Sequence, residues 1–132
     1  MIQLEITYKT KMPPITEAFL RQSAKNAAKV LRLSQNFSVS LVFIGPQVMK
    51  RLNFIYRKKN KVTDVLSFEG LNEIFICLIQ AKKQSKEHRQ TLKQEVALLL
   101  VHGILHLLGY DHQTDRQNRV MENLQEKILK VS

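Results

Sequence analysis

The sequence predicts a single α/β domain spanning residues 1–132, in which a small mixed sheet of about four strands packs with helices. Apolar residues recur at strand spacing in some segments and at helical spacing in others. Together these segments give the order β-α-β-α-β-β-α-α, which is typical of one layered α/β structure. With 132 residues and 44% hydrophobic content, the chain is long enough to bury one core.

The first strand and helix are separated by two prolines. Polar and apolar residues alternate over residues 2–8, which predicts a half-buried strand. Pro13 and Pro14 then interrupt the pattern. Thr16 has the right side chain to cap a helix, and the apolar spacing predicts that this helix runs to about Leu33.

A second strand and helix follow. Residues 37–44 are β-branched and increasingly apolar, which predicts a strand. The apolar residues Val48, Leu52 and Ile55 then recur at helical spacing after Pro46, so we expect a helix that turns Leu52 and Ile55 toward the core.

Two short apolar runs predict the remaining strands. They cover residues 64–69 and 72–79 and are separated by a short connection around Gly70. The polar residues 80–90 predict a loop and the start of the next helix.

The last third of the chain predicts two helices. The first runs from about Thr91 to Leu108, and because it is apolar nearly all round after Val96, we expect it to be buried. Gly109 can supply the left-handed turn that ends it. Thr114 or Asp115 can cap the final helix, whose apolar stripe consists of Val120, Met121, Leu124 and Ile128.

The charge balance favours a polyanionic partner. Lys and Arg outnumber Asp and Glu by 21 to 11, which gives a net charge of +10. Residues 50–61 hold six basic residues and no acidic one, and residues 82–93 form a second basic cluster. This excess favours nucleic acid as the partner.

The composition also limits the cellular setting. Cys77 is the only cysteine, so no disulfide can form within the chain, and a reducing cytoplasmic location fits. The longest apolar run, residues 96–110, is too short to span a bilayer. We therefore expect no membrane partner.

Three histidines form the most informative motif, "VHGILHLLGYDH". His102 and His106 are four residues apart, so they share one face of the predicted helix. Gly109 lets the chain turn back, which allows His112 to become a third ligand. Three imidazoles suit one zinc ion and leave a fourth position open, although nickel, copper and iron also accept imidazole.

Position 103 separates this motif from that of the zinc proteases. Proteases with this histidine spacing carry a Glu after the first His, where it accepts the proton of water. Gly103 cannot do so, which disfavours peptide hydrolysis. For phosphodiester chemistry the site would need a cation near the phosphate, and the basic run over residues 50–61 supplies candidates.

The histidine block resembles the signature of the YbeY family of bacterial rRNA maturation factors. A second block, residues 53–68, is similar to the family's Asn-x-x-Tyr-Arg followed by Thr-Asp-Val-Leu-Ser-Phe. The resemblance covers nearly the whole chain. It implies a zinc-dependent endoribonuclease specific for single strands, which acts in 16S rRNA 3′-end processing and ribosome quality control. The implied partners are single-stranded RNA, rRNA and the small ribosomal subunit, with no DNA expected.

The resemblance also implies residue roles. One zinc ion per chain would be held by His102, His106 and His112, and Arg57 would line the cleft and be needed for activity. Asn53 and Arg57 are four residues apart and share a helix face, where the arginine offers a fork for a phosphate. We expect RNA contacts from Asn53, Arg57, Lys58, Lys59 and Lys61.

Some residues depart from the family pattern or admit two interpretations. Asn72-Glu73 stand where the family has Gly-Asp, and Glu69 stands where it usually has Pro. Asp111 is either an acceptor that orients a ligand imidazole or a plain turn residue. Thr63 and Asp64 match the family but also suit a turn into a strand. His88 lies in a polar basic stretch, so we expect a solvated surface residue.

Two other functions stay open at this point. One is a non-catalytic RNA- or ribosome-binding assembly factor whose metal fastens the last helix to the turn. The other, more distant, is a metalloprotease.

Overall fold

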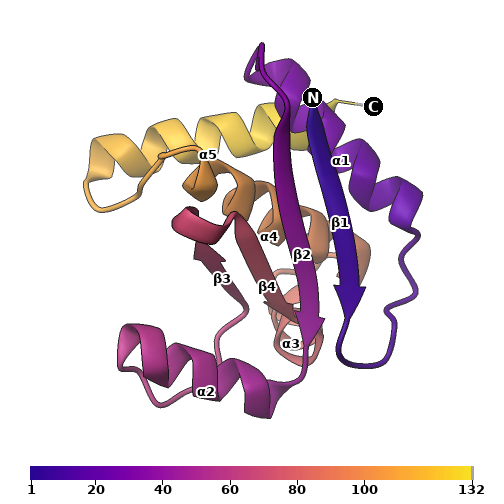
Figure 1. Ribbon diagram of the computed structural model, residues 1–132, viewed down its shortest axis with the longest axis vertical. Helices are drawn as coiled ribbons and strands as arrows, with labels where there is room; N and C mark the ends of the chain where they lie inside the picture. Colours follow the sequence, from indigo (N-terminus) through magenta and orange to yellow (C-terminus); the bar gives the residue numbers. More distant parts are fainter. Residues whose placement is uncertain (132) are drawn as a thin grey trace.

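The computed structural model describes residues 1–131 and confirms the predicted α/β class (Figure 1). The strands form one sheet in the order β1-β2-β4-β3. β1 pairs with β2 in parallel, β2 pairs with β4 in parallel, and β3 is antiparallel to β4. Their bounds are β1 Ile2–Tyr8, β2 Phe37–Ile44, β3 Val65–Phe68 and β4 Glu73–Cys77.

The helices cover both faces of the sheet unequally. One face packs against α1, α4 and α5, and the other packs against α2 (Figure 1). A short 3₁₀ turn, η1, joins β3 to β4. The bounds are α1 Glu17–Val30, α2 Pro46–Arg57, η1 Glu69–Leu71, α3 Leu78–Glu87, α4 Leu92–Leu107 and α5 Asp115–Lys130.

The central strand β2 contributes to both hydrophobic layers. Leu41 and Phe43 point into the main core, whereas Val42 and Ile44 point toward Met49 of α2. A strand buried on both faces needs apolar residues in succession, which explains the nearly continuous apolar run at its end.

The helix α3 corrects the prediction for residues 72–90. The strand predicted to reach residue 79 ends at Cys77, and a helix begins at Leu78 where a loop was expected. Its only buried residues are Ala81 and Ser85. Because both are small and the exposed face is rich in charge, the helix carries almost no apolar pattern to detect.

Two further helical features differ from the sequence prediction. α1 ends at Val30 rather than near Leu33, and Arg32 adopts a positive φ of 53° just beyond it. On α2, Met49 and Asn53 face the sheet, and Ile55 is 56% exposed rather than buried. Leu52 packs against the buried cluster as expected, so only Ile55 departs from the prediction. Asn53 takes the buried position, where its side-chain nitrogen donates a hydrogen bond to the backbone carbonyl of Lys61.

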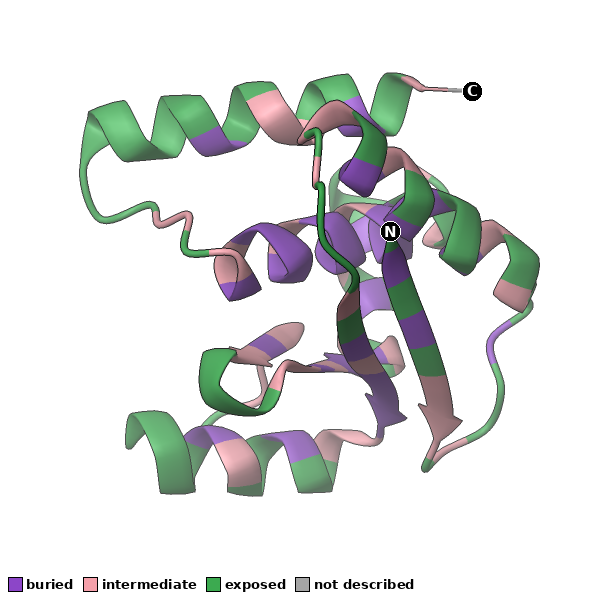
Figure 2. Ribbon diagram, turned by 45° about the horizontal axis from the view of Figure 1, so that its top comes forward, coloured by how far each residue is buried: buried purple, intermediate pink, exposed green. Residues whose placement is uncertain are grey.

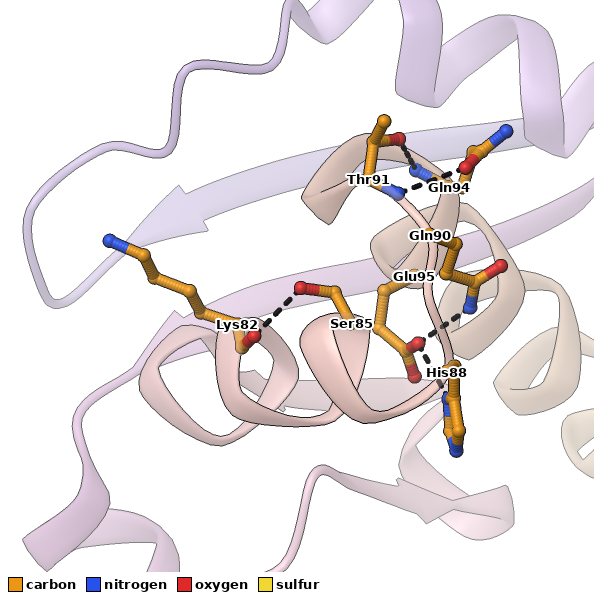
Figure 3. A network of polar contacts seen from close by, with 7 residues as sticks. All are labelled: Lys82, Ser85, His88, Gln90, Thr91, Gln94 and Glu95. Atoms are coloured by element: carbon orange, nitrogen blue, oxygen red, sulfur yellow. Dashed lines mark hydrogen bonds and ion pairs between the residues drawn. The ribbon is translucent and has the colours of Figure 1, made fainter.

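Glu95 forms a buried polar junction between α3 and α4 (Figure 3). Its carboxylate lies 2.9 Å from Nδ1 of His88 and accepts a 2.6 Å hydrogen bond from Gln90. His88 is exposed, as expected from the sequence, but its ring is not free of contacts. The hydrogen bond to Glu95 raises the pKa of His88.

Helix α4 is buried along most of its length (Figure 2). It approaches β4 so closely that a Cβ at Gly103 would lie 2.9 Å from Cδ1 and 3.0 Å from Cγ2 of Ile74. Ile74 is itself fully buried. A side chain at position 103 would therefore point into the sheet, and the absence of one allows the helix and strand to pack.

We predict that Gly103→Ala lowers the free energy of unfolding by about 1–2 kcal/mol, because the crowding against Ile74 outweighs the better helix propensity of alanine. In an Ile74→Ala background the crowding atoms are gone, so the same substitution should become neutral or stabilising. Urea unfolding of the unmodified protein, the two single variants and the double variant measures this double-mutant cycle. An equal loss in both backgrounds would contradict the packing explanation.

Candidate functional site

The structure brings the three predicted histidines together. His102 and His106 lie one turn apart on α4, and Gly109 follows with a φ of +98° that returns the chain toward them. The centroid of the His112 ring lies 5.5 Å from that of His102 and 4.9 Å from that of His106. One nitrogen from each ring lies within 4.8 Å of the others, so the three imidazoles form a candidate metal site.

Gln125 on α5 orients one of these rings, a role that the sequence analysis missed. Its side-chain oxygen lies 2.7 Å from Nδ1 of His102. This contact favours a proton on Nδ1 and leaves Nε2 free to bind a metal, which is the usual arrangement around metal-binding histidines. The two residues are 23 positions apart, and only the packing of α5 on α4 joins them.

The histidine rings on α4 are held in the neutral form that metal binding requires. Burial lowers the pKa of His102 below its ordinary value. Burial also lowers the pKa of His106, and the neighbouring rings of His102 and His112 add to the effect. Since a neutral imidazole offers a lone pair without first losing a proton, both rings are ready to bind a cation.

The histidines form one wall of a cleft of about 740 Å³. Figure 1 shows β3 between α2 and α4, and residues of β3 line the cleft between the two helices. Tyr56 and Arg57, at the end of α2, also line it. The charge of Arg57 makes the smallest contribution to the lowered pKa of His106. The cleft therefore combines a wall that carries the candidate metal site with a wall that carries a cationic side chain.

The expected RNA-contacting residues separate into two groups. Arg57 lines the cleft, and Lys58, Lys59 and Lys61 are exposed on the loop that follows α2 but do not line the cleft. Lys58 turns the chain with a φ of 56°.

Asn53 does not fit the expected contact with RNA, because its side chain is fully buried. Its side-chain nitrogen donates a 2.9 Å hydrogen bond to the backbone carbonyl of Lys61, and its backbone carbonyl accepts a 3.3 Å bond from the backbone N–H of Lys59. Asn53 thus fastens the basic loop beside the cleft rather than facing the solvent.

The two acidic residues of the cleft stabilise turns. Asp111 accepts a 2.7 Å hydrogen bond from the backbone N–H of His112, which matches the interpretation as a turn residue. Asp64 accepts a 2.8 Å bond from the backbone N–H of Val65 and a 3.3 Å bond from the hydroxyl of Thr63, at the entry to β3. Both residues line the cleft as well.

Asn72 stands where the family pattern has Gly, and the backbone conformation explains why asparagine is tolerated there. Asn72 has a φ of 50°, in the left-handed region. Glycine adopts this region most easily and asparagine is the commonest alternative. Glu69 opens the exposed turn η1, outside the lining of the cleft. The two departures therefore leave the three histidines and the cleft wall intact.

Comparisons with known proteins identify the family. A sequence model of the family described as "Endoribonuclease YbeY" matches residues 4–132. Endoribonuclease YbeY of Phytoplasma australiense is 41% identical over 111 residues, which cover 75% of this chain and 77% of that protein. The protein of the same name from Syntrophomonas wolfei is 33% identical, with 96% of this chain and 90% of that protein covered.

The fold also matches a solved structure. The solution structure of TM1509 from Thermotoga maritima superposes with a TM-score of 0.68 at 25% sequence identity, covering 97% of this chain and 87% of that one.

We predict that Gln125→Ala weakens zinc binding by about 10–100-fold, because the ring of His102 loses the acceptor that orients it. Asn123→Ala is the matched control, since this neutral residue is exposed on the same helix. Competition with a chromogenic chelator measures both affinities. If the two variants bind zinc as tightly as the unmodified protein, Gln125 does not support the site.

Proposed function

Because this chain belongs to the YbeY family of endoribonucleases, we propose that it is a zinc-dependent endoribonuclease that cuts single-stranded rRNA during ribosome maturation. The observation that supports this most strongly is the convergence of three imidazoles on one wall of a cleft that carries Arg57 on another. We expect the 3′ end of 16S rRNA on the small ribosomal subunit as the substrate, with a further role in ribosome quality control. Such a substrate would place the protein in the cytoplasm.

The side chains fit one zinc ion per chain. Three neutral imidazoles are a donor set that zinc accepts, and their nitrogens are close enough to share a single ion. His102, His106 and His112 would hold it, with Gln125 fixing the first ring. When bound, zinc supplies an acidified water molecule and charge stabilisation for a phosphoryl oxygen.

The basic residues would bind the RNA phosphates and stabilise the charge that develops at the reacting one. The guanidinium of Arg57 presents paired donors to the phosphate at the reacting bond and offsets the charge that develops there. Lys58, Lys59 and Lys61 follow the RNA backbone beyond the cleft, where their exposed side chains meet phosphates, which are the same in every sequence. Asn53 keeps this loop next to the cleft through its bond to Lys61.

None of the helices described for residues 1–131 combines the length and the apolar character needed to cross a bilayer.

A peptidase is the less suitable function for this cleft. Position 103, where the zinc proteases carry their base, faces Ile74 rather than the histidines. The acidic residues that do line the cleft, Asp64 and Asp111, each accept a backbone hydrogen bond. The net charge of +10 also favours RNA over most protein substrates.

We predict that single-stranded RNA is cleaved by the zinc-loaded protein and that a chelator stops the reaction. His106→Ala should abolish cleavage, and Arg57→Ala should slow it by about 10²–10³-fold, because one donor to a developing charge is lost. Arg51→Ala removes the same charge from an exposed site outside the cleft, so it should have a much smaller effect. Gel analysis of end-labelled RNA measures the rates.

The His106→Ala protein also serves as the control for contaminating nucleases, since it is purified in the same way. If that variant is folded and free of metal yet cuts as fast as the unmodified protein, the enzymatic function is wrong. Binding of the small subunit without any cleavage would instead favour an assembly factor in which the metal fastens the turn of His112 to α4.

A further inference from the structure

Tyr56 is an aromatic residue that the preceding assignments leave without a role. The residue is 62% exposed and lies on the wall of the cleft next to Arg57. Exposing a large aromatic ring to water forgoes the stabilisation that burial would bring. An aromatic residue in this position suggests a binding surface for a flat apolar ligand.

The ring of Tyr56 is supported by two further aromatic rings, one directly and the other through the first. It packs against Phe68 of β3 at 4.9 Å between ring centroids with an interplanar angle of 64°. Phe68 in turn contacts Phe75 of β4 at 5.6 Å and 77°. Phe68 and Phe75 both pack against the buried cluster between the sheet and α2, which includes Ile44. The ring is therefore anchored to the core through other aromatic rings although the residue is largely exposed, and these contacts reduce the entropy that is lost on binding.

The chemistry around this ring matches a nucleotide. Arg57 is the next residue and lines the same cleft, so a cation for a phosphate stands beside a surface for a base. Residues 50–62 contain no acidic side chain that would repel an anion. Proteins that bind single-stranded nucleic acids use the same combination of a basic groove and exposed aromatic rings.

We propose that Tyr56 is a specificity-determining residue, whose ring stacks on an unpaired base of the RNA strand that Arg57 holds by its phosphate. This inference rests on the proposed function and adds the reason why the cleft selects single strands. In a duplex both faces of each base are covered by its neighbours, so the ring of Tyr56 has no surface to stack on. An unstacked base in a single strand has a free face on which the ring can stack.

The alternative is that Tyr56 only covers Phe68 and stabilises β3. The two roles differ in what they require of the ring. A cover needs bulk, and any large side chain provides it. Stacking on a base needs a flat aromatic ring, and its strength depends on whether the RNA carries a base at that position.

Fluorescence provides the direct test, because the chain contains no tryptophan. Tyr56→Trp introduces a single indole at the cleft, and Phe54→Trp introduces one on the same helix at a residue that is 56% exposed but lies outside the cleft lining. The zinc-loaded proteins are mixed with a single-stranded oligoribonucleotide and read before cleavage proceeds. We expect strong quenching for Tyr56→Trp with the single strand, none with a duplex at equal phosphate concentration, and little for Phe54→Trp.

The RNA affinities of Tyr56 variants distinguish stacking on a base from merely covering Phe68. Tyr56→Ala and Tyr56→Leu should each weaken single-strand binding by about 5- to 150-fold, the range expected for one stacked base, whereas Tyr56→Phe should bind almost normally. Duplex affinity should not change, and an oligonucleotide with abasic positions should bind the unmodified protein as weakly as the alanine variant binds the intact strand.

The inference is overturned if Tyr56→Leu binds and selects single strands as well as the unmodified protein does, or if quenching is equal for single strand and duplex. In that case cleavage by the unmodified protein still upholds the endoribonuclease function. Absence of both binding and cleavage by the unmodified protein would reject the proposed function and the inference with it.

Discussion

Helix α4 lies against the sheet with most of its residues buried, and the close contact between Gly103 and Ile74 sets how near it comes to β4. Side chains of β3, β4 and the packed helices α1, α3 and α5 surround it. His102 and His106 border the cleft on α4 and are partly buried, and His112 joins them from the exposed turn beyond the helix. A largely buried helix thus positions two of the three candidate metal ligands, which is what a preorganised site requires.

The cleft depends on elements that are distant in the sequence. α4 and the turn after it supply the histidines, α5 supplies the acceptor for His102, and the end of α2 supplies the tyrosine and arginine. The antiparallel edge strand β3 lies between them and links the two walls. Because β3 also carries Phe68, the strand that forms the floor of the cleft supports the ring of Tyr56 as well. The candidate metal site and the ring that we propose stacks on RNA therefore share one scaffold.

The sequence predicted those features that depend on neighbouring residues. The spacing of His102 and His106 places them on one face of any helix, and Gly109 permits the turn that brings His112 back. Features created by tertiary packing escaped prediction. Gln125 is remote from His102 in sequence, α3 buries only Ala81 and Ser85, and the orientation of α2 follows from the buried hydrogen bond of Asn53. An apolar pattern cannot reveal that a polar residue faces the core.

X-ray absorption spectroscopy of the protein loaded with one equivalent of zinc tests the central claim most directly. The account predicts one tightly bound ion with three imidazole nitrogens and one oxygen from water, at distances of about 2.0–2.1 Å from the nitrogens. The His112→Ala protein should lose one imidazole from this shell while α4 stays folded. A shell with fewer than three imidazoles in the unmodified protein, or one that is unchanged in the variant, would contradict the convergence of the three rings on a single ion.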